Sequence, residues 1–459
     1  MKVILLLLFF FSSLSFAVEN FQIPIRPPYL LSPLELKKSG TLKIPDETKK
    51  EAIPTSWGGN SLTQEEREIM GIKNKVFTLS GGAWILHRKV HLSAATIEIV
   101  GENAILGELK NGVKVEDKER GVTFYSGNGL YNKLTETILL ERNPRLYYKD
   151  KQNKTTKVTC TRIQRFMAES RTELQENVII ENDDYVIYAN KATFNEQEKT
   201  LYLDEYPFIF GKNLFITGKK ASYNNDSGIT RLEENTILLQ NSYKTKPVKF
   251  SKEKKTEETP VLEEEKKERI VSIFTGDKLI REDSGKKEES YAGMFGHARL
   301  YRPDYEFEAE EAKARGEKLE NIEAKKNVVF WDKENKIKVW GNFYSYNKEE
   351  DYMHITEGAK VEFFNNLQDE EPKSTLTAVE IERFGSLKEV VARGNVLIQT
   401  EKATARGQYA SYLEEEEKLE LLGAPALLGK NGVLRCGKII LYPKTDRAVI
   451  TEGIKVEKK

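Results

Sequence analysis

The sequence predicts an all-β protein whose antiparallel strands form domains in tandem. From Val76 onward, β-rich runs such as NVIIEN and VLRCGKIILY alternate with polar turn clusters. Asn-Gly pairs at Asn111-Gly112 and Asn431-Gly432 favour tight hairpins, because both turn positions need positive φ. A strand–turn–strand phrase also recurs along the chain. From these residues we expect a meandering sandwich or an open barrel.

The recurring phrase has a fixed spacing. A small residue is followed by an aromatic residue at +5, by apolar residues at +12 and +14, and by proline at +18 in the full copies. Full and looser copies begin, in chain order, at Ser126, Ala189, Gly218, Gly341, Gly407 and Gly437. Successive starts are 63 and 29 residues apart in the first three copies and 66 and 30 in the last three. The second half therefore resembles a duplicate of the first.

The N-terminus predicts export. Lys2 precedes an apolar run, and Ser15-Phe16-Ala17 provides a small-x-small cleavage site, so we expect a signal peptide at residues 1–17. An uncleaved N-terminal anchor is the alternative. Residues 18–71 are interpreted as a Pro-rich lead segment, with one short helix at SLTQEEREIM because Ser61 and Gln64 have capping-box spacing. We expect an exported protein, soluble or peripherally associated with a membrane.

Two β domains are predicted, at residues 72–243 and 270–459. Residues 244–269 between them contain few apolar side chains, two prolines and dense mixed charge. Such a stretch cannot bury enough surface to offset the entropy of ordering it. We therefore expect a charged linker or loop there, where a protease cuts first.

Composition and motifs do not indicate an enzyme. Lys and Arg number 72, as do Asp and Glu, and no basic stripe indicates nucleic acid. His87 and His91 are four residues apart but have no further ligand at metal-binding spacing, so we predict no metal, no cofactor and no catalytic residue. Cys160 and Cys436 are interpreted as buried apolar residues, although an oxidising compartment allows a disulfide.

Apolar residues on the predicted strands have two interpretations. They fill a sandwich core, or they line a channel for an amphipathic ligand if the two sheets do not close. Apolar residues two apart on a strand share a face, but a one-residue slip in register would invert that face. The candidate groove residues are Val178, Ile180, Leu201, Leu203, Phe208, Phe210, Val396, Ile398, Leu419, Leu421, Ile439 and Leu441.

Residues 394–457 and 176–241 resemble the OstA-like (LptA-type) repeat of periplasmic lipopolysaccharide-transport proteins. The shared pattern is a GNV strand, small-x-x-x-x-Tyr, a turn, L-x-L-x-G-x-P and a second Gly-x-x-x-x-Tyr hairpin. The earlier copy departs from it at Phe194 and Tyr206, and the match is weaker over 76–150 and 296–366. The resemblance implies open antiparallel β-jellyrolls, each a V-shaped pair of sheets with lipid acyl chains inside.

The resemblance also implies a function. The chain would be a periplasmic bridge that carries lipopolysaccharide or a related lipid from inner to outer membrane, with transport components of both membranes as partners. Because the chain is longer than the single-domain bridge and we expect no outer-membrane barrel after its repeats, a tandem soluble form is predicted. Edge strands, including the last one at EGIKVEKK, would allow head-to-tail self-association. The alternatives are a structural or adhesive β-repeat protein of the envelope and, third, a polysaccharide-active enzyme on a β-helix.

Overall fold

The computed structural model describes residues 55–69, 71–101, 104–149, 154–245, 267–282, 290–316, 321–401, 404–429, 432–442 and 447–458. These ranges contain β-strands and no helix, and hence no helix long and apolar enough to cross a membrane. The strand pairs are antiparallel, which confirms the predicted all-β, antiparallel class. The predicted signal peptide and the lead segment up to residue 54 lie outside the described residues.

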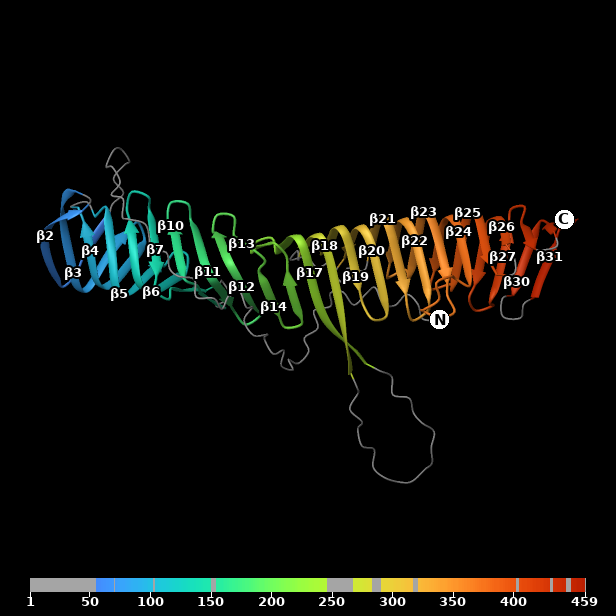
Figure 1. Cartoon of the computed structure of the whole chain (residues 1–459), viewed down its shortest axis with the longest axis horizontal. Coiled ribbons are helices and arrows are strands. Elements are labelled where there is room, and N and C mark those ends of the chain that lie inside the picture. Colours follow the sequence, from blue (N-terminus) through green and yellow to red (C-terminus); the bar gives the residue numbers. More distant parts are fainter. Residues whose placement is uncertain are drawn as a thin grey trace, which may run out of the picture. The chain divides into compact units, whose positions relative to one another are not determined.

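The strands divide into two compact units after Asp226. Within each unit, successive strands run side by side (Figure 1). The N-terminal unit contains β1 (Thr55–Gly58), β2 (Ser61–Ile69), β3 (Ile72–His87), β4 (Val90–Val100), β5 (Leu106–Asp117), β6 (Val122–Asn132), β7 (Thr137–Glu141), β8 (Arg145–Lys149), β9 (Thr155–Thr159), β10 (Arg162–Phe166), β11 (Arg171–Glu181), β12 (Tyr185–Asn195), β13 (Thr200–Asp204), β14 (Phe208–Gly211), β15 (Leu214–Thr217) and β16 (Lys220–Asn224).

The C-terminal unit contains the remaining strands. They are β17 (Ile229–Thr245), β18 (Lys267–Glu282), β19 (Tyr291–Tyr301), β20 (Tyr305–Arg315), β21 (Asn321–Asp332), β22 (Ile337–Asn347), β23 (Tyr352–Phe363), β24 (Ser374–Phe384), β25 (Glu389–Thr400), β26 (Thr404–Leu413), β27 (Lys418–Leu422), β28 (Ala426–Gly429), β29 (Gly432–Arg435), β30 (Lys438–Tyr442), β31 (Arg447–Thr451) and β32 (Lys455–Lys458).

The charged segment does not separate the two units. β17 and β18 pair with each other from Ile229↔Glu282 to Thr245↔Lys267, so the residues between them connect two neighbouring strands of the C-terminal unit. The boundary lies earlier in the chain than the predicted 244–269. Charge density identified a long connection between strands, but it could not distinguish a connection within a unit from one between units.

The sequence SLTQEEREI forms a strand, not the predicted helix. β2 pairs with β3 from Ser61↔Ser80 to Ile69↔Ile72, so strands begin before residue 72. The capping-box residues are exposed, and Arg67 forms an ion pair with Glu98 on β4. Backbone hydrogen bonding to β3 thus overrides the local helix signal.

Alternate strands, or pairs of short strands, bend at two consecutive residues with positive φ, which we call a corner. The corners are Gly81-Gly82, Asn111-Gly112, Arg142-Asn143, Glu176-Asn177, Glu205-Tyr206, Glu234-Asn235, Gly296-His297, Lys326-Asn327, Glu357-Gly358, Gly394-Asn395, Gly423-Ala424 and Glu452-Gly453. At several of them two residues oppose one on the neighbouring strand, as in a β-bulge, and the strand direction changes.

Asn111-Gly112 is therefore a corner inside β5, not the predicted hairpin. Its residues do have positive φ, as the dipeptide indicates, but the chain continues along the same strand. The second Asn-Gly pair lies partly outside the described residues. The flanking strands β28 and β29 form an antiparallel pair ending at Gly429↔Gly432.

The corners divide each unit into two wings whose inner faces pack together. In the N-terminal unit, wing A contains the strand residues within 83–93, 113–126, 145–159, 178–189 and 208–217, and wing B those within 72–80, 96–110, 128–141, 162–175, 191–204 and 220–224. A Cβ on Gly107 of wing B would lie 2.9 Å from Ile85 Cδ1 of wing A, so the wings are in close contact.

The C-terminal unit has the same two-wing arrangement. Its wing A contains the strand residues within 236–275, 298–309, 328–341, 359–378, 396–407, 426–435 and 455–458, and its wing B those within 229–233, 278–295, 311–325, 343–356, 380–393, 409–422 and 438–451. In both units we call the side opposite the corners, where the strand-end turns lie, the mouth.

The two-wing geometry explains the recurring phrase. Its small residue lies beside a corner and faces inward; a Cβ on Gly407 would lie 2.8 Å from Leu421 Cδ1 and 2.9 Å from the Leu422 carbonyl oxygen. The aromatic residue at +5 and the apolar residues at +12 and +14 are cross-strand neighbours on wing B, as in Tyr412↔Leu419. The proline at +18 directly follows the next corner, as Pro425 follows Gly423-Ala424.

Candidate functional site

Ten of the twelve candidate groove residues face the interior of their unit. In the N-terminal unit, Val178 and Ile180 lie on wing A, and Leu203 lies on wing B. The others on an inner face are Leu201, Val396, Ile398, Leu419, Leu421, Ile439 and Leu441. Leu201, Ile398, Leu419 and Leu441 are half-buried, and the other six are buried.

Phe208 and Phe210 are on the outer face, contrary to the prediction. Ile209 between them pairs with Ile187, the inward partner of Ile180, so the two phenylalanines point the other way. Three consecutive apolar residues do not reveal which face is inward. Phe210 is nevertheless buried, because it contacts an outer aromatic cluster, with ring centroids 5.1 Å from Phe215 and 5.9 Å from Tyr188.

The interior of the N-terminal unit is filled by its own side chains. Most inward residues on both wings are buried, and they lie in cross-strand rows. The row on wing A includes Ile85, Leu92, Val115, Phe124, Val158 and Ile180, and the row on wing B includes Leu79, Ile97, Leu109, Leu140, Ile163 and Leu174. The inner faces are therefore a core rather than the walls of an open groove.

A polar network bridges the mouth of the N-terminal unit. We call Asp117, Arg120, Arg165 and Glu196 the mouth network. Asp117 and Arg120 come from the wing A end of β5 and its turn, whereas Arg165 and Glu196 come from wing B. The Arg165 guanidinium lies 3.4 Å from Asp117 Oδ2 and also pairs with Glu196, and Arg120 Nε lies 2.7 Å from Glu196 Oε2. The Arg165 and Asp117 side chains are only 3% and 2% exposed.

A second polar contact bridges the same mouth at His87. This buried ring receives hydroxyl contacts on Nδ1 from Tyr131, at 2.8 Å, and Thr55, at 3.0 Å. Its Nε2 lies 3.6 Å from Glu136 Oε2, and Glu136 also pairs with Arg88 at 2.9 Å. Burial lowers the pKa of His87 and raises the pKa of Tyr131. Burial therefore favours the neutral form of the His87 ring.

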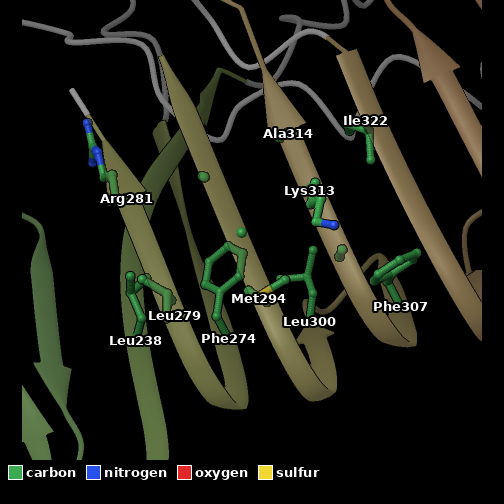
Figure 2. A pocket seen from close by; sticks show the side chains of 13 residues that line it. Leu238, Phe274, Leu279, Arg281, Met294, Leu300, Phe307, Lys313, Ala314 and Ile322 are labelled. Carbon is green, nitrogen blue, oxygen red and sulfur yellow. The ribbon is translucent and has the colours of Figure 1, made fainter. Parts of the chain in front are cut away.

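The C-terminal unit contains a half-open apolar pocket between its wings (Figure 2). Its empty volume is about 740 Å³, part of which is open to solvent. Wing A contributes Leu238, Phe274, Leu300 and Phe307, and wing B contributes Leu279, Arg281, Ala292, Gly293, Met294, Ala312, Lys313, Ala314 and Ile322. None of these residues is among the twelve candidates.

Small side chains on wing B create the pocket. Ala292, Ala312 and Ala314 lie on three inner positions that face the larger Phe274 and Phe307 of wing A. On β22, Tyr344 and Tyr346 occupy the corresponding inner positions and are only 2% and 3% exposed. The ring centroids of Tyr344 and Phe307 are 6.5 Å apart, so aromatic side chains meet across the interior there. The pocket therefore ends at β22.

A cationic side chain lies beside this apolar surface. Arg281 lines the pocket near the end of β18. Lys313 lies between the inward Ala312 and Ala314 and points to the outer face, where its Nζ lies 3.1 Å from Glu311 Oε2 and 5.4 Å from the centroid of the Phe295 ring. Ion pairs elsewhere in this unit, such as Arg302–Asp304 at 2.9 Å, join residues of the same wing. The pocket can accept a long apolar group and place an anionic group beside it.

Neither the histidines nor the cysteines suggest a reactive centre. His91 pairs with Leu86 on the outer face, whereas His87 points inward, so the two histidines do not share a face. Cys160 and Cys436 are buried and unpaired, and burial raises the pKa of Cys160 to about 12. Among the described ranges, no group of three His, Cys, Asp or Glu residues could hold a metal ion.

The chain matches no protein-family model and no curated protein.

The sequence did contain a signal for the pocket. Ala312 and Ala314 occupy inner positions of wing B on β20, whereas β22 carries Tyr344 and Tyr346 at the corresponding positions. Only the strand register shows that this alanine-rich segment faces large residues on the other wing.

Proposed function

We propose that this protein is a periplasmic lipid-binding bridge that carries lipopolysaccharide or a related lipid between the inner and outer membranes. The pocket of the C-terminal unit is the observation that carries the proposal. It is lined by both wings, is largely apolar and opens on one side, as an acyl-chain site requires. Transport needs no catalytic group, and burial of a 12-carbon chain contributes on the order of 9 kcal/mol gross.

The repeat resemblance in residues 176–241 and 394–457 also supports this function. A bridge needs surfaces that pair with the next component. At the C-terminal end, the pairings of β31 and β32 found among the described residues are β31 with β30 and β32 with β29. Ile454 and Val456 nearby are 55% and 63% exposed. We propose this edge as a docking position for a membrane-bound transport component or another copy of the chain.

A structural or adhesive role in the envelope is the second candidate. The packed interior of the N-terminal unit favours it, because that unit resembles a solid β core. The half-open pocket favours transport instead, because a purely structural core gains nothing from unfilled apolar space.

Photo-crosslinking in cells tests the proposal. A photoreactive residue at Met294 or Phe307 should form adducts with lipopolysaccharide or a related lipid, because both line the pocket. Matched positions at Lys338, on the outer face, and Glu415, in an exposed turn, should form none. If folded protein captures lipid at no pocket position, the transport function is wrong and the structural role takes its place.

A further inference from the structure

The two ends of the pocket have different chemistry. Five inward residues are successive cross-strand partners from β18 to β22. They are Arg281, Ala292, Ala314, Ile322 and Tyr346. The row therefore begins with a cation, continues through small and apolar side chains, and ends at a buried tyrosine. Figure 2 shows Arg281 and Ile322 on opposite sides of the pocket.

The tyrosine end is closed by two rings. Tyr344 and Tyr346 lie on the same face of β22, and Tyr344 is the cross-strand partner of Ala324. On the opposite wing, Phe307 packs towards Tyr344. A chain extending from β18 across β19, β20 and β21 would therefore meet an aromatic wall at β22.

We propose that the pocket binds an anionic amphiphile, with its carboxylate or phosphate at Arg281 and its acyl chain directed towards Tyr344 and Tyr346, which limit chain length. This inference rests on the proposed function and specifies its ligand. A guanidinium forms two parallel hydrogen bonds with a carboxylate or phosphate, which a neutral head group cannot match. Beyond Arg281 the pocket is lined mainly by carbon atoms, which suit the acyl chain.

Strand spacing sets the length of the site. Three spacings of about 4.8 Å separate β18 from β21, which gives roughly 14 Å. At ordinary carbon–carbon bond lengths, an extended chain of about 11 carbons spans that distance. Affinity should therefore increase with chain length up to this limit and then level off or fall.

Calorimetry with the full-length protein tests the inference. The probes are straight-chain fatty acids and alkyl phosphates of increasing length, with the matched neutral alcohols. We expect Arg281→Met to weaken binding of both anionic series by about tenfold, while alcohol binding stays unchanged. Equal loss in both anionic series indicates general recognition of anions, and loss in only one identifies the head group that is recognised.

The aromatic wall is tested in the same assay. Tyr344→Ala should shift the preferred length to longer chains, whereas Tyr412→Ala, the matched loss of an inward tyrosine on β26, should not. Ala314→Leu should shift the preference to shorter chains, and it keeps the test available if Tyr344→Ala does not fold. No binding by the wild-type protein would overturn the proposed function. Binding with no effect of Arg281→Met, Tyr344→Ala or Ala314→Leu would overturn this inference alone.

Discussion

Individual side chains determine whether the wings of a unit enclose a core or a pocket. In the N-terminal unit, Arg165 and Asp117 meet across the mouth, above large inward residues. In the C-terminal unit, Ala292 and Ala314 leave space that Tyr346 fills one strand beyond the pocket. Both units follow the same backbone plan, so the difference lies in side-chain size and charge.

Loss of Arg165 should destabilise the N-terminal unit. Arg165→Met leaves the buried Asp117 carboxylate with Arg120 as its remaining cationic partner in the mouth network, and Thr172 loses a hydrogen bond at 2.9 Å. We expect a decrease of about 3 kcal/mol in the free energy of unfolding, measured by urea denaturation of the full chain. Arg162→Met is the control, because Arg162 and its partner Glu141 are about 30% exposed. A similar loss in both variants would contradict the role of the mouth network.

His87 should make stability depend on pH. Burial lowers its pKa in the folded protein below the ordinary 6.5, so the unfolded chain binds the proton more tightly. Its stabilising contribution is complete above pH 6.5 and is lost as the pH falls towards the folded pKa. Urea denaturation at a series of pH values should show this loss in wild type and a smaller one in His87→Gln. His297→Gln, at an exposed histidine, should behave like wild type.

Residue patterns predicted part of the candidate site. Val178 and Ile180 alternate with polar or outward residues, so their inward face could be inferred from spacing. Phe208 and Phe210 flank Ile209, and only the pairing of Ile209 with Ile187 shows which residue is inward. The pocket required still more information, because Ala314 and Phe274 come from opposite wings and their separation in sequence says nothing about the space between them.

The corner is the structural element that distinguishes this fold from a simple β meander. Positive φ at two consecutive positions was anticipated at Asn111-Gly112, but with the wrong structural consequence. The same geometry occurs at Glu176-Asn177 and Lys326-Asn327, where one of the two residues is not a typical turn former. Sequence therefore indicated the strands well and the corners poorly, because pairing with neighbouring strands imposes the bend.

A branched residue at a corner should weaken the C-terminal unit. Asn327 has φ of 53°, and its backbone N–H donates to Asn342 Oδ1 at 3.1 Å. Asn327→Val places a β-branched side chain in the left-handed region and should cost about 1–2 kcal/mol of unfolding free energy. Asn327→Gly, which tolerates this φ, should be close to wild type in the same thermal or urea denaturation. Equal stability of the two variants would contradict the importance of the corner.

At the scale of the whole molecule, the sequence predicted the repeats more accurately than the boundary between the two units. The copies at Ser126, Ala189 and Gly407 do occupy equivalent positions beside corners. The segment 244–269 did not mark the boundary, because composition reports only the low burial potential of a stretch. The segment connects β17 with β18, and this pairing could not be read from composition because the two strands are far apart in sequence.

Cleavage of the charged segment should leave the C-terminal unit assembled. A site-specific protease sequence inserted within residues 246–266 separates β17 from β18 in the chain, but their pairing from Ile229↔Glu282 to Thr245↔Lys267 remains. The two fragments should elute together in size-exclusion chromatography under native conditions and separate only in denaturant. The uncleaved insertion variant is the control. Separation in native buffer would show that this ladder does not hold the unit together.

The placement of corners on alternate strands constrains how such a gene can change in length. Glu205-Tyr206 and Glu234-Asn235 are 29 residues apart, as are Gly423-Ala424 and Glu452-Gly453. Duplication or loss of one such interval adds or removes two full-length strands, or four short ones, and keeps the remaining bends aligned. An odd strand would place two strands with corners, or two without, side by side and break this alternation. Unequal recombination can therefore lengthen or shorten this protein in steps of about 30 residues while the cross-section of each unit stays constant.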